Sequence, residues 1–406
     1  MKFLIDANEL KRVMKTVRKV FSLYSSREGI NKACLLHGDV EGKTLVVEFA
    51  LNDVFIQHTF IDIEFPGQQQ NFKRSVDFLS LADLNFSEPL LELSIGSENK
   101  IYFKNGGLSG TLLVSNSDIE KFIEKSRPTV EWNYRYAFKL PLFIEAMEAH
   151  CYGKHTDSQA LERPVRFLAF EDKNVFLSQD NIAACYLEKD TQISDADIIF
   201  YPGMMLQILK TLDKTPGVFS YDEAEQTWGL AYDRTRIWGP KYSARPPKLE
   251  LLSIIKAVKE SSGYCVKILA LEFSKHLQSI KPFFDGSELK DKESAPFVTL
   301  SFKTGSQLQL QITNRRAFDV NKDVTVEYTG TFEEPQNISF ILNYDFVIEF
   351  LASLTKNAKS KESLLEIIWW PYADEQYPTR GRAVAFSVDG NYYLVSRVSL
   401  KKGISL

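Results

Sequence analysis

The chain has 406 residues, of which 44% are hydrophobic and 25% are charged, so it is long enough for two or three domains and too long for a single small core. Its formal net charge of −4 and its pI of about 5.9 exclude a uniformly basic nucleic-acid-binding protein, so any surface for a polyanion must be local. The four cysteines stand far apart with no CxxC pair, and no run of about 18 apolar residues is present. We therefore expect reduced thiols, no membrane segment and a cytoplasmic location.

A short strand that runs into an amphipathic helix is expected three times, at regular intervals. The three segments are Lys2–Phe21, Tyr136–Ala149 and Val266–Phe284. When Asn8, Pro141 and Phe273 are taken as equivalent helix starts, the separations are 133 residues (141−8) and 132 residues (273−141). An interval of this length is too long for a solenoid repeat, so it indicates tandem domains of one fold.

A second helix is predicted in the latter half of each repeat, with strands around it. These helices are expected over Phe72–Leu84, Tyr201–Leu212 and Asn343–Leu354. Runs with strand composition and turn punctuation include Thr44–Ala50, Val54–Phe65, Leu90–Ile95, Val165–Phe170, Phe297–Phe302, Leu308–Ile312, Val324–Tyr328 and Ala383–Val388. Each repeat is therefore predicted to be a domain of the α+β class.

Two linkers separate the three predicted domains. The first lies near Lys125–Trp132 and contains Pro128. The second, over Ala244–Gly263, contains Pro246 followed by a helix-like run at Leu249–Glu260. The predicted domains cover residues 1–127, 132–245 and 264–406.

The first predicted helix separates apolar and basic residues onto opposite sides. The apolar stripe has i, i+3, i+4, i+7 spacing and consists of Leu10, Val13, Met14, Val17 and Phe21. The other side carries five cations with no acid between them, namely Lys11, Arg12, Lys15, Arg18 and Lys19. Like charges four residues apart oppose helix formation, so this ridge favours an anionic partner, with a solvated surface helix as the alternative.

Further cations occur where helices recur. They are Lys73 and Arg74 in the first repeat, Lys210 and Lys214 in the second, and Lys275, Lys281, Lys356 and Lys359 in the third. The first helix of the second repeat is an exception, because Glu145 and Glu148 are acidic and only Lys139 precedes it. Cations that neutralise phosphates without reading bases would give binding to DNA that is independent of sequence and sensitive to salt.

Motifs in the third repeat resemble, in order and spacing, those of the bacterial DNA polymerase III beta subunit, the sliding clamp. They are VTVEYTG (Val324–Gly330), SFILNYDFVIEFLASL (Ser339–Leu354) and YLVSRVSL (Tyr393–Leu400), and the resemblance extends over essentially the full chain. It implies three tandem clamp domains, each with two helices on one side of antiparallel sheets, and a head-to-tail homodimer that closes into a ring. It also implies a processivity factor without catalytic activity or cofactor that encircles double-stranded DNA, tethers a DNA polymerase and is served by a clamp loader.

The resemblance and the charge pattern together assign three sets of site residues. The DNA-binding set is Lys11, Arg12, Lys15, Arg18, Lys73, Arg74, Lys154, Lys210, Lys214 and Lys275. The resemblance implies a pocket for an apolar partner peptide at Ser178, Asn181, Ile182, Pro246, Val395, Ser396 and Val398. It implies a subunit interface at Leu108, Phe283 and Phe284, with ordinary core as the alternative for the two phenylalanines.

The chain departs from the family at the predicted pocket. The family's threonine-aspartate-glycine-histidine-arginine-leucine stretch is replaced by SQDNIA (Ser178–Ala183), and its methionine-proline-methionine ending is replaced by Ser396, Arg397 and Val398. We therefore expect a partner peptide that differs from the bacterial one. Such divergence would suit a virus-encoded clamp.

Patterns typical of catalytic or metal sites are incomplete. Gly38–Thr44 (GDVEGKT) resembles a phosphate-binding loop, but its first glycine is one residue too close and a strand follows, which favours a hairpin turn. His150, Cys151 and His155 lack a matching second pair, which favours a polar loop over a zinc site, and we expect no metal. The alternative function is a scaffold that keeps the clamp fold and binds replication proteins without encircling DNA, favoured by the acidic helix and the altered pocket.

Overall fold

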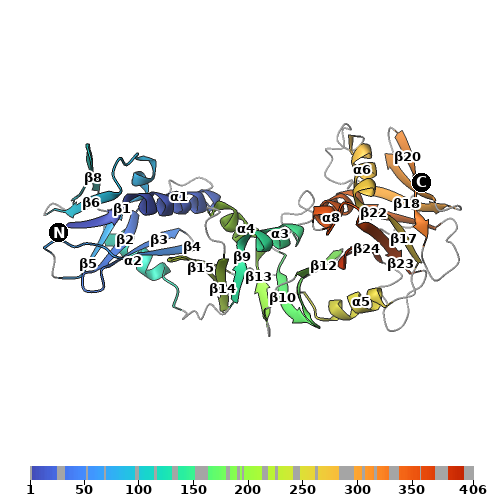
Figure 1. Cartoon of the computed structure of the whole chain (residues 1–406), viewed down its shortest axis with the longest axis horizontal. Coiled ribbons are helices and arrows are strands. Elements are labelled where there is room, and N and C mark those ends of the chain that lie inside the picture. Colours follow the sequence, from blue (N-terminus) through green and yellow to red (C-terminus); the bar gives the residue numbers. More distant parts are fainter. Residues whose placement is uncertain are drawn as a thin grey trace. The chain divides into compact units, whose positions relative to one another are not determined.

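The computed structural model shows a chain of helices and antiparallel strands (Figure 1). It describes residues 2–24, 33–51, 54–67, 70–96, 100–113, 117–129, 136–150, 163–179, 183–189, 193, 196–212, 218–224, 227–240, 247–260, 264–282, 297–303, 307–314, 318–328, 338–356, 358–370 and 383–396. Among these residues, no helix is both long and apolar enough to span a membrane. Helices and antiparallel sheets occur together, as predicted for an α+β protein.

One order of elements occurs three times: a strand, a helix, a group of strands, a helical segment and three strands. The first repeat contains β1 (Lys2–Asp6), α1 (Ala7–Tyr24), β2 (Ala33–Asp39), β3 (Thr44–Leu51), β4 (Val54–Phe60), β5 (Phe72–Asp77), the 3-10 helix η1 (Leu79–Asp83), β6 (Leu90–Ile95), β7 (Lys100–Asn105) and β8 (Leu108–Leu113). The second contains β9 (Tyr136–Lys139), α3 (Leu140–His150), β10 (Val165–Phe170), β11 (Lys173–Gln179), β12 (Ala183–Lys189), β13 (Asp197–Phe200), α4 (Pro202–Thr211), β14 (Val218–Ala224), β15 (Thr227–Tyr232) and β16 (Thr235–Pro240). The third contains β17 (Tyr264–Leu269), α6 (Ala270–Ile280), β18 (Phe297–Lys303), β19 (Gln307–Asn314), β20 (Phe318–Thr325), β21 (Glu327–Tyr328), β22 (Ile338–Asn343), α8 (Tyr344–Lys356), β23 (Leu364–Trp369), β24 (Ala383–Val388) and β25 (Asn391–Ser396). Two of the described helices lie between repeats: α2 (Ser117–Ser126) and α5 (Glu250–Lys259).

The regular spacing of the first helices is confirmed. They begin at Ala7, Leu140 and Ala270, which are 133 (140−7) and 130 (270−140) residues apart. An equivalent backbone hydrogen bond occurs at the start of this helix in the first and third repeats. The N–H of Ala7 donates to the carbonyl of Pro89 at 2.8 Å, and the N–H of Ala270 donates to the carbonyl of Ser363 at 3.0 Å. In the third repeat, this helix begins at Ala270, three residues before the predicted start at Phe273.

The helix predicted over Phe72–Leu84 is wrong. Its first half forms the strand β5, which pairs with β2, and η1 follows. The spacing is ambiguous, because Phe72 and Val76 are four residues apart and would share one side of either a helix or a strand, so pairing with β2 decides the structure. The corresponding helices of the other repeats, α4 and α8, form as predicted.

The described strands form four sheets, two of which combine strands from neighbouring repeats. The strand orders are β1-β6-β7-β8, β5-β2-β3-β4-β16-β15-β14-β9, β13-β10-β11-β12-β25-β24-β23-β17-β21 and β20-β19-β18-β22. In the eight-stranded sheet, β4 of the first repeat pairs with β16 of the second. In the nine-stranded sheet, β12 of the second repeat pairs with β25 of the third.

Contacts divide the chain into two compact units rather than three. One unit comprises Met1–Ile144 and Met204–Ser243, and the other comprises Glu145–Gly203 and Ala244–Leu406. Each unit contains one of the two combined sheets, so the division passes through the second repeat. The boundaries of the three predicted domains stay a prediction.

In the first unit, helices cover both faces of the eight-stranded sheet (Figure 1). Phe21 of α1 contacts Phe49 of β3 edge to face, with ring centroids 6.4 Å apart. The next residue, Ala50, belongs to a buried cluster with Ile123 of α2 and Trp238 of β16. Because successive strand residues point to opposite faces, α1 and α2 pack on opposite sides of the sheet.

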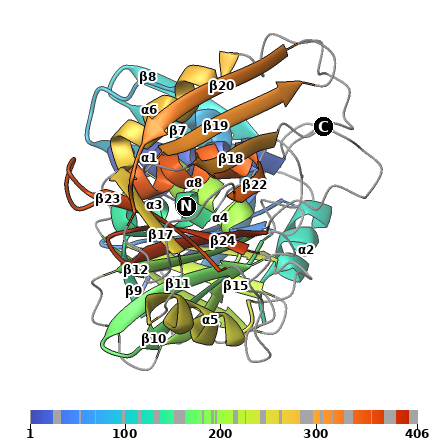
Figure 2. The same ribbon diagram turned by 90° about the vertical axis from the view of Figure 1, so that its right-hand side faces the viewer.

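In the second unit, the nine-stranded sheet is likewise covered on both faces (Figure 2). Tyr393 of β25 stacks on Phe350 of α8 with ring centroids 4.3 Å apart. Its hydroxyl donates to the carbonyl of Ala149 of α3 at 2.6 Å and lies 2.8 Å from Ser353 Oγ of α8. The neighbouring Leu394 is instead in a buried cluster with α5. Tyr393 thus joins helices of the second and third repeats at the β12–β25 junction.

Replacing Tyr393 by phenylalanine is expected to lower the free energy of unfolding by about 1–2 kcal/mol, because the buried carbonyl of Ala149 loses its donor. Chemical denaturation measures the change. The matched control is Tyr102→Phe. Tyr102 is 44% exposed, so its hydroxyl is expected to bond to water, and its removal should leave the free energy of unfolding nearly unchanged. Equal stability of Tyr393→Phe and wild type would contradict a structural role for this hydroxyl.

Candidate nucleic-acid interface

The helix α1 presents the predicted apolar stripe to the sheet and the predicted basic ridge to solvent. Leu10, Val13, Met14, Val17 and Phe21 are all at most 5% exposed. Lys15 and Lys19 are exposed, whereas Lys11, Arg12 and Arg18 are half-buried. The amphipathic reading of this helix is therefore confirmed.

Two of the five cations on α1 are neutralised by acids of the same unit. Arg12 Nη1 lies 3.0 Å from Asp233 Oδ2, and Arg18 pairs with Asp83 and also donates to the carbonyl of Leu79 at 2.7 Å. These arginines contribute to fixing α1 against the β15–β16 turn and η1. Their availability to an anion is correspondingly reduced.

The three lysines of α1 form a row of uncompensated charge. Lys11, Lys15 and Lys19 are four residues apart, so they follow one side of the helix at intervals of about 6 Å along its axis. Lys11 Nζ donates to the neutral Asn85 Oδ1 at 3.0 Å. Within the described ranges, none of the three lysines has an acidic partner. This lysine row is the part of the ridge that is best suited to bind an anion.

A buried polar network holds α1 at the β4–β16 junction. His58 of β4 is fully buried, with Nδ1 2.7 Å from Thr235 Oγ1 and Nε2 3.2 Å from Glu9 Oε1. Arg234 donates to the same oxygen of Glu9 at 2.7 Å. Burial of Glu9 raises its pKa, but the hydrogen bond with His58 and the charge of Arg234 outweigh it, so the pKa of Glu9 lies below its usual value. Glu9 is thus held ionised at the start of the basic helix.

The predicted DNA-binding residues of β5 do not join the lysine row. Lys73 pairs with Glu120 at 2.9 Å and with Glu124, both on α2. It therefore points to the face of the sheet opposite α1. Arg74 is exposed and, as the next strand residue, points the other way.

In the second unit, the acidic helix is compensated by lysines. Glu145 of α3 pairs with Lys189 at 2.9 Å, and Glu148 pairs with Lys356 of α8 at 2.7 Å. The charge of Lys356 is therefore used inside the protein. Lys275 is exposed on α6 of this unit, and Lys210 is exposed on α4 in the part of that helix that belongs to the first unit. Lys154 and Lys214 lie outside the described residues.

The predicted partner pocket is only partly described. Ser178 is fully buried, and its Oγ lies 2.6 Å from Nδ1 of the buried His150, so its side chain faces the interior rather than the surface. Val395 is also fully buried, where it pairs with Ala183 across the β12–β25 junction. Ser396 is the last residue of β25. Asn181, Ile182, Pro246 and Val398 lie outside the described residues.

Of the predicted subunit interface, only Leu108 is described. It is half-buried and begins β8, which pairs with β7. Phe283 and Phe284 lie outside the described residues, as do Cys151 and His155 of the suggested metal group. Within the part of the chain that is described, no three His, Cys, Asp or Glu side chains are grouped so that they could hold a metal ion.

One surface was missed by the site predictions. Tyr186, Glu188 and Tyr392 gather at the β12–β25 junction beneath α5, and Lys259 of α5 lies against them. The available signal was the helix-like run at Leu249–Glu260, whose apolar spacing requires an apolar surface to cover. The run was interpreted only as part of a linker.

The comparison with known proteins bears on the fold. No protein-family model and no curated protein matches the sequence. Many solved structures match, and three of them do so over nearly the full length: the beta subunit of a DNA polymerase of Streptococcus pyogenes (TM-score 0.69, 10% identity, 98% of this chain and 100% of that chain), the DNA polymerase sliding clamp of Caulobacter crescentus (0.69, 11%, 98% and 100%) and the DNA polymerase III beta subunit of Thermotoga maritima (0.67, 14%, 98% and 99%). The chain has the sliding-clamp fold. The predicted resemblance is thus confirmed for the fold, and it covers all three repeats.

Replacing Lys15 and Lys19 of this sliding-clamp fold by glutamate is expected to weaken binding to short duplex DNA by about tenfold or more, and to lower the slope of log affinity against log salt by about 2. Binding titrations at several salt concentrations measure both quantities. The matched control is Lys121→Glu with Lys125→Glu, an equal change of charge on exposed positions of α2. An equal loss in both double variants would assign the effect to net charge rather than to the lysine row.

The stability of the second unit is expected to depend on the titration of His150. Burial lowers the pKa of His150 to about 3, and Arg163 and Lys189 add to the effect. The unfolded chain binds this proton near pH 6.5, so the free energy of unfolding should fall as the pH is lowered from 6.5 toward 3, by about 2 kcal/mol between pH 6.5 and 5. Denaturation of wild type and His150→Gln at both pH values isolates this contribution. A parallel pH dependence of the two proteins would rule it out.

Proposed function

We propose that this protein is a DNA polymerase processivity factor, a sliding clamp that encircles duplex DNA and tethers a replicative polymerase without catalysing a reaction. The observation that carries the proposal is the pattern of strand edges. It is supported by the lysine row on α1 and by the full-length likeness to solved sliding clamps. The proposal includes a homodimer, a cytoplasmic setting and a clamp loader that places the ring on DNA.

The same pairing rule joins consecutive repeats at both junctions within the chain. Each repeat contributes two groups of paired strands, here called half-sheets. One half-sheet ends in β4, β12 or β20 in the first, second and third repeats, and the other ends in β8, β16 or β25. The end strand of the first kind pairs with the end strand of the second kind from the next repeat, as β4 does with β16 and β12 with β25. Applying the rule once more would pair β20 with a β8.

The strands β8 and β20 are the two ends that the rule leaves over. Among the described strands, β8 pairs with β7 and β20 with β19, and neither has a second neighbour. Unpaired strand edges have unsatisfied backbone donors and acceptors, which favours pairing with another chain. A second copy supplies the complementary edge, and two such head-to-tail contacts would close a ring.

Closure around DNA would explain how an acidic protein stays on a polyanion. A closed ring cannot dissociate from circular DNA, so tight binding is unnecessary, and a local row of lysines would suffice to orient the duplex. Contacts restricted to phosphates leave the ring free to slide. A polymerase bound to the ring is held at high effective concentration near the template, so its affinity for the ring need be only modest.

Retention on circular DNA is the direct test. Protein loaded onto nicked circles is expected to remain bound through gel filtration at moderate salt and to be released when the circles are linearised, because only topology holds it. Equal loss from both forms would favour the alternative, a clamp-fold scaffold that binds replication proteins without encircling DNA. Mass measurement in solution should give a dimer.

Leu108 offers a matched pair of variants for the closure. Leu108→Asp is expected to shift the dimer toward monomer and to abolish retention on circles, because it replaces a half-buried apolar side chain of the β8 edge strand with a charge. Ser109→Asp adds the same charge at the neighbouring exposed position of β8 and should retain both properties. A dimer that is unaffected by Leu108→Asp would place the interface elsewhere.

A further inference from the structure

The linker helix α2 packs across the first junction between repeats. Its Ile123 is fully buried in one cluster with Phe55 of β4 and Trp238 of β16. Phe55 and Trp238 are opposite each other in the strand register, with ring centroids 5.4 Å apart. The helix therefore covers a pair of aromatic side chains that lies directly over the junction.

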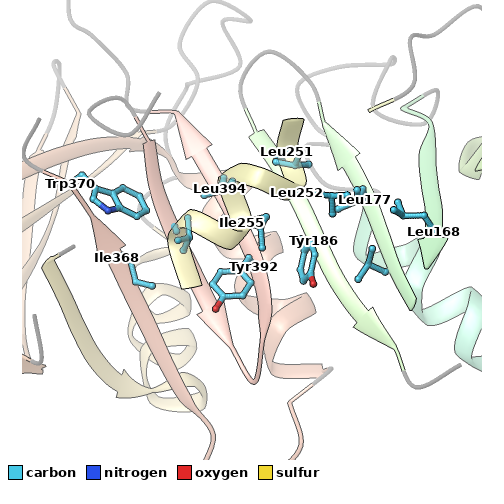
Figure 3. Close-up of a cluster of buried hydrophobic side chains, with 14 residues drawn as sticks. Leu168, Leu177, Tyr186, Leu251, Leu252, Ile255, Ile368, Trp370, Tyr392 and Leu394 are labelled. Atoms are coloured by element: carbon cyan, nitrogen blue, oxygen red, sulfur yellow. The ribbon is translucent and has the colours of Figure 1, made fainter. Parts of the chain in front are cut away.

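The linker helix α5 covers the second junction in the same way. Its Ile255 is buried in one cluster with Tyr186 of β12 and Tyr392 of β25 (Figure 3). These tyrosines are also opposite each other in the strand register, and their ring centroids are 6.0 Å apart. An aromatic pair under a linker helix is thus common to both junctions within the chain.

Both linker helices are also held by an ion pair at the end that leads into the next repeat. Arg127 directly follows α2, and its Nη2 lies 2.6 Å from Oε2 of Glu48 on β3. Lys259 is the last residue of α5, and its Nζ lies 2.6 Å from Oε1 of Glu188 on β12. In each case the cation leads on to the next repeat, whereas the glutamate belongs to the preceding one.

The two glutamates are largely buried and ionised. The side chain of Glu48 is 2% exposed and that of Glu188 is 11% exposed. Burial raises the pKa of each carboxyl, but hydrogen bonds from neighbouring groups, Arg127 and Lys259 among them, outweigh it and hold both pKa values below the usual range. Loss of the cation would leave a buried charge with fewer partners, which is costly, so each ion pair fixes the end of its helix.

The ion pair of α5 shortens the connection between the second and third repeats. Lys259 stands five residues before Tyr264, the first residue of β17 (264−259), so β17 begins within about 18 Å of Lys259. The whole connection from Pro240 of β16 to Tyr264 has 24 residues (264−240) and could span about 86 Å if the helix came away. While Lys259 is held, the third repeat therefore cannot move far from the second.

The strand edges that would join two copies lack these features. Lys322 of β20 bonds to Ser279 of α6 at 2.7 Å, so its neighbour Asp323 faces away from that helix. Asp323 accepts a hydrogen bond from Gln309 of β19 at 3.0 Å instead of packing under a linker. The exposed positions described on the two edge strands are all polar, namely Asn321, Asp323 and Thr325 on β20 and Ser109 and Thr111 on β8. They provide no apolar surface for a covering helix.

We propose that α2 and α5 are clasps, which keep the two junctions within the chain shut by fastening the start of one repeat to the preceding repeat. The clasps themselves follow from the contacts within each unit, and only their consequence for a ring rests on the proposed function. In a ring of two copies, both junctions of each copy would be clasped, whereas the junctions between copies would not. Separation within a copy would then require more free energy than separation between copies.

Hydrogen exchange on the full-length protein tests the clasp of α5. Lys259→Met removes the cation but keeps most of the side chain, and it is expected to speed exchange of the β12 and β25 amides at least about tenfold, because the junction opens more often. Lys256→Met, at an exposed position on α5, is the matched control and should leave this exchange unchanged. Lys259→Arg keeps the charge and should stay close to wild type. Amides of β18, in a different sheet, are the internal reference.

The clasp of α2 is tested in the same way at the other junction. Arg127→Met is expected to speed exchange of the β4 and β16 amides at least about tenfold relative to β7, which belongs to a different sheet. Lys125→Met, at an exposed position near the end of α2, is the matched control and should behave as wild type. Arg127→Lys keeps the charge and should retain most of the protection.

Each outcome decides. Unchanged exchange at either junction, or an equal rise in the reference strands, overturns the proposal. Both variants are expected to fold, because the side chains of Lys259 and Arg127 are 30% and 42% exposed. Retention on nicked circles separates this inference from the proposed function. Failure of the clasps leaves retention of the wild type intact, whereas failure of the clamp abolishes retention and leaves the difference in exchange between the variants and their controls.

Discussion

Backbone hydrogen bonding between strand edges determines how the repeats of this chain are assembled. Each half-sheet of a repeat ends in a strand edge, and backbone groups that are buried without a hydrogen-bond partner are costly. Pairing β4 with β16 and β12 with β25 satisfies four of these edges and creates the two combined sheets. The basic helix depends on the first junction, because the network of His58, Thr235 and Glu9 fixes α1 where these strands meet.

The distribution of charge follows from this assembly. If an acidic chain binds DNA, as proposed for this one, its carboxylates must lie away from the binding surface or be neutralised there. Glu145 and Glu148 are neutralised by lysines of the same unit, and Glu9 is enclosed by a histidine and arginines. Arg12 and Arg18 are used for packing. The lysine row of α1 remains, so the local positive charge is smaller than the count of cations on that helix indicates.

The spacing of apolar residues was sufficient to predict the elements that bury only one side. The stripe of α1 and the regular helix starts were predictable because a 3.6-residue period is unambiguous over eighteen residues. Phe72–Asp77 was not, since a short segment satisfies both periods and pairing with β2 decides between them. Ser178 was placed on the surface by resemblance, whereas its position in β11 turns it toward His150. The helix α2 was missed because its ten residues adjoin the first linker.

The linkers differ from the repeats in what constrains them. Repeated strands must keep their edges compatible with the next repeat, which preserves the fold even where identity with solved clamps is 10–14%. The helices α2 and α5 pair with no strand, and each packs across a junction on a buried apolar cluster. Their sequences can therefore change without disturbing the assembly. In the first unit, α1 with its lysine row and the linker helix α2 pack on opposite faces of the eight-stranded sheet, so a change in this linker leaves the lysine row in place.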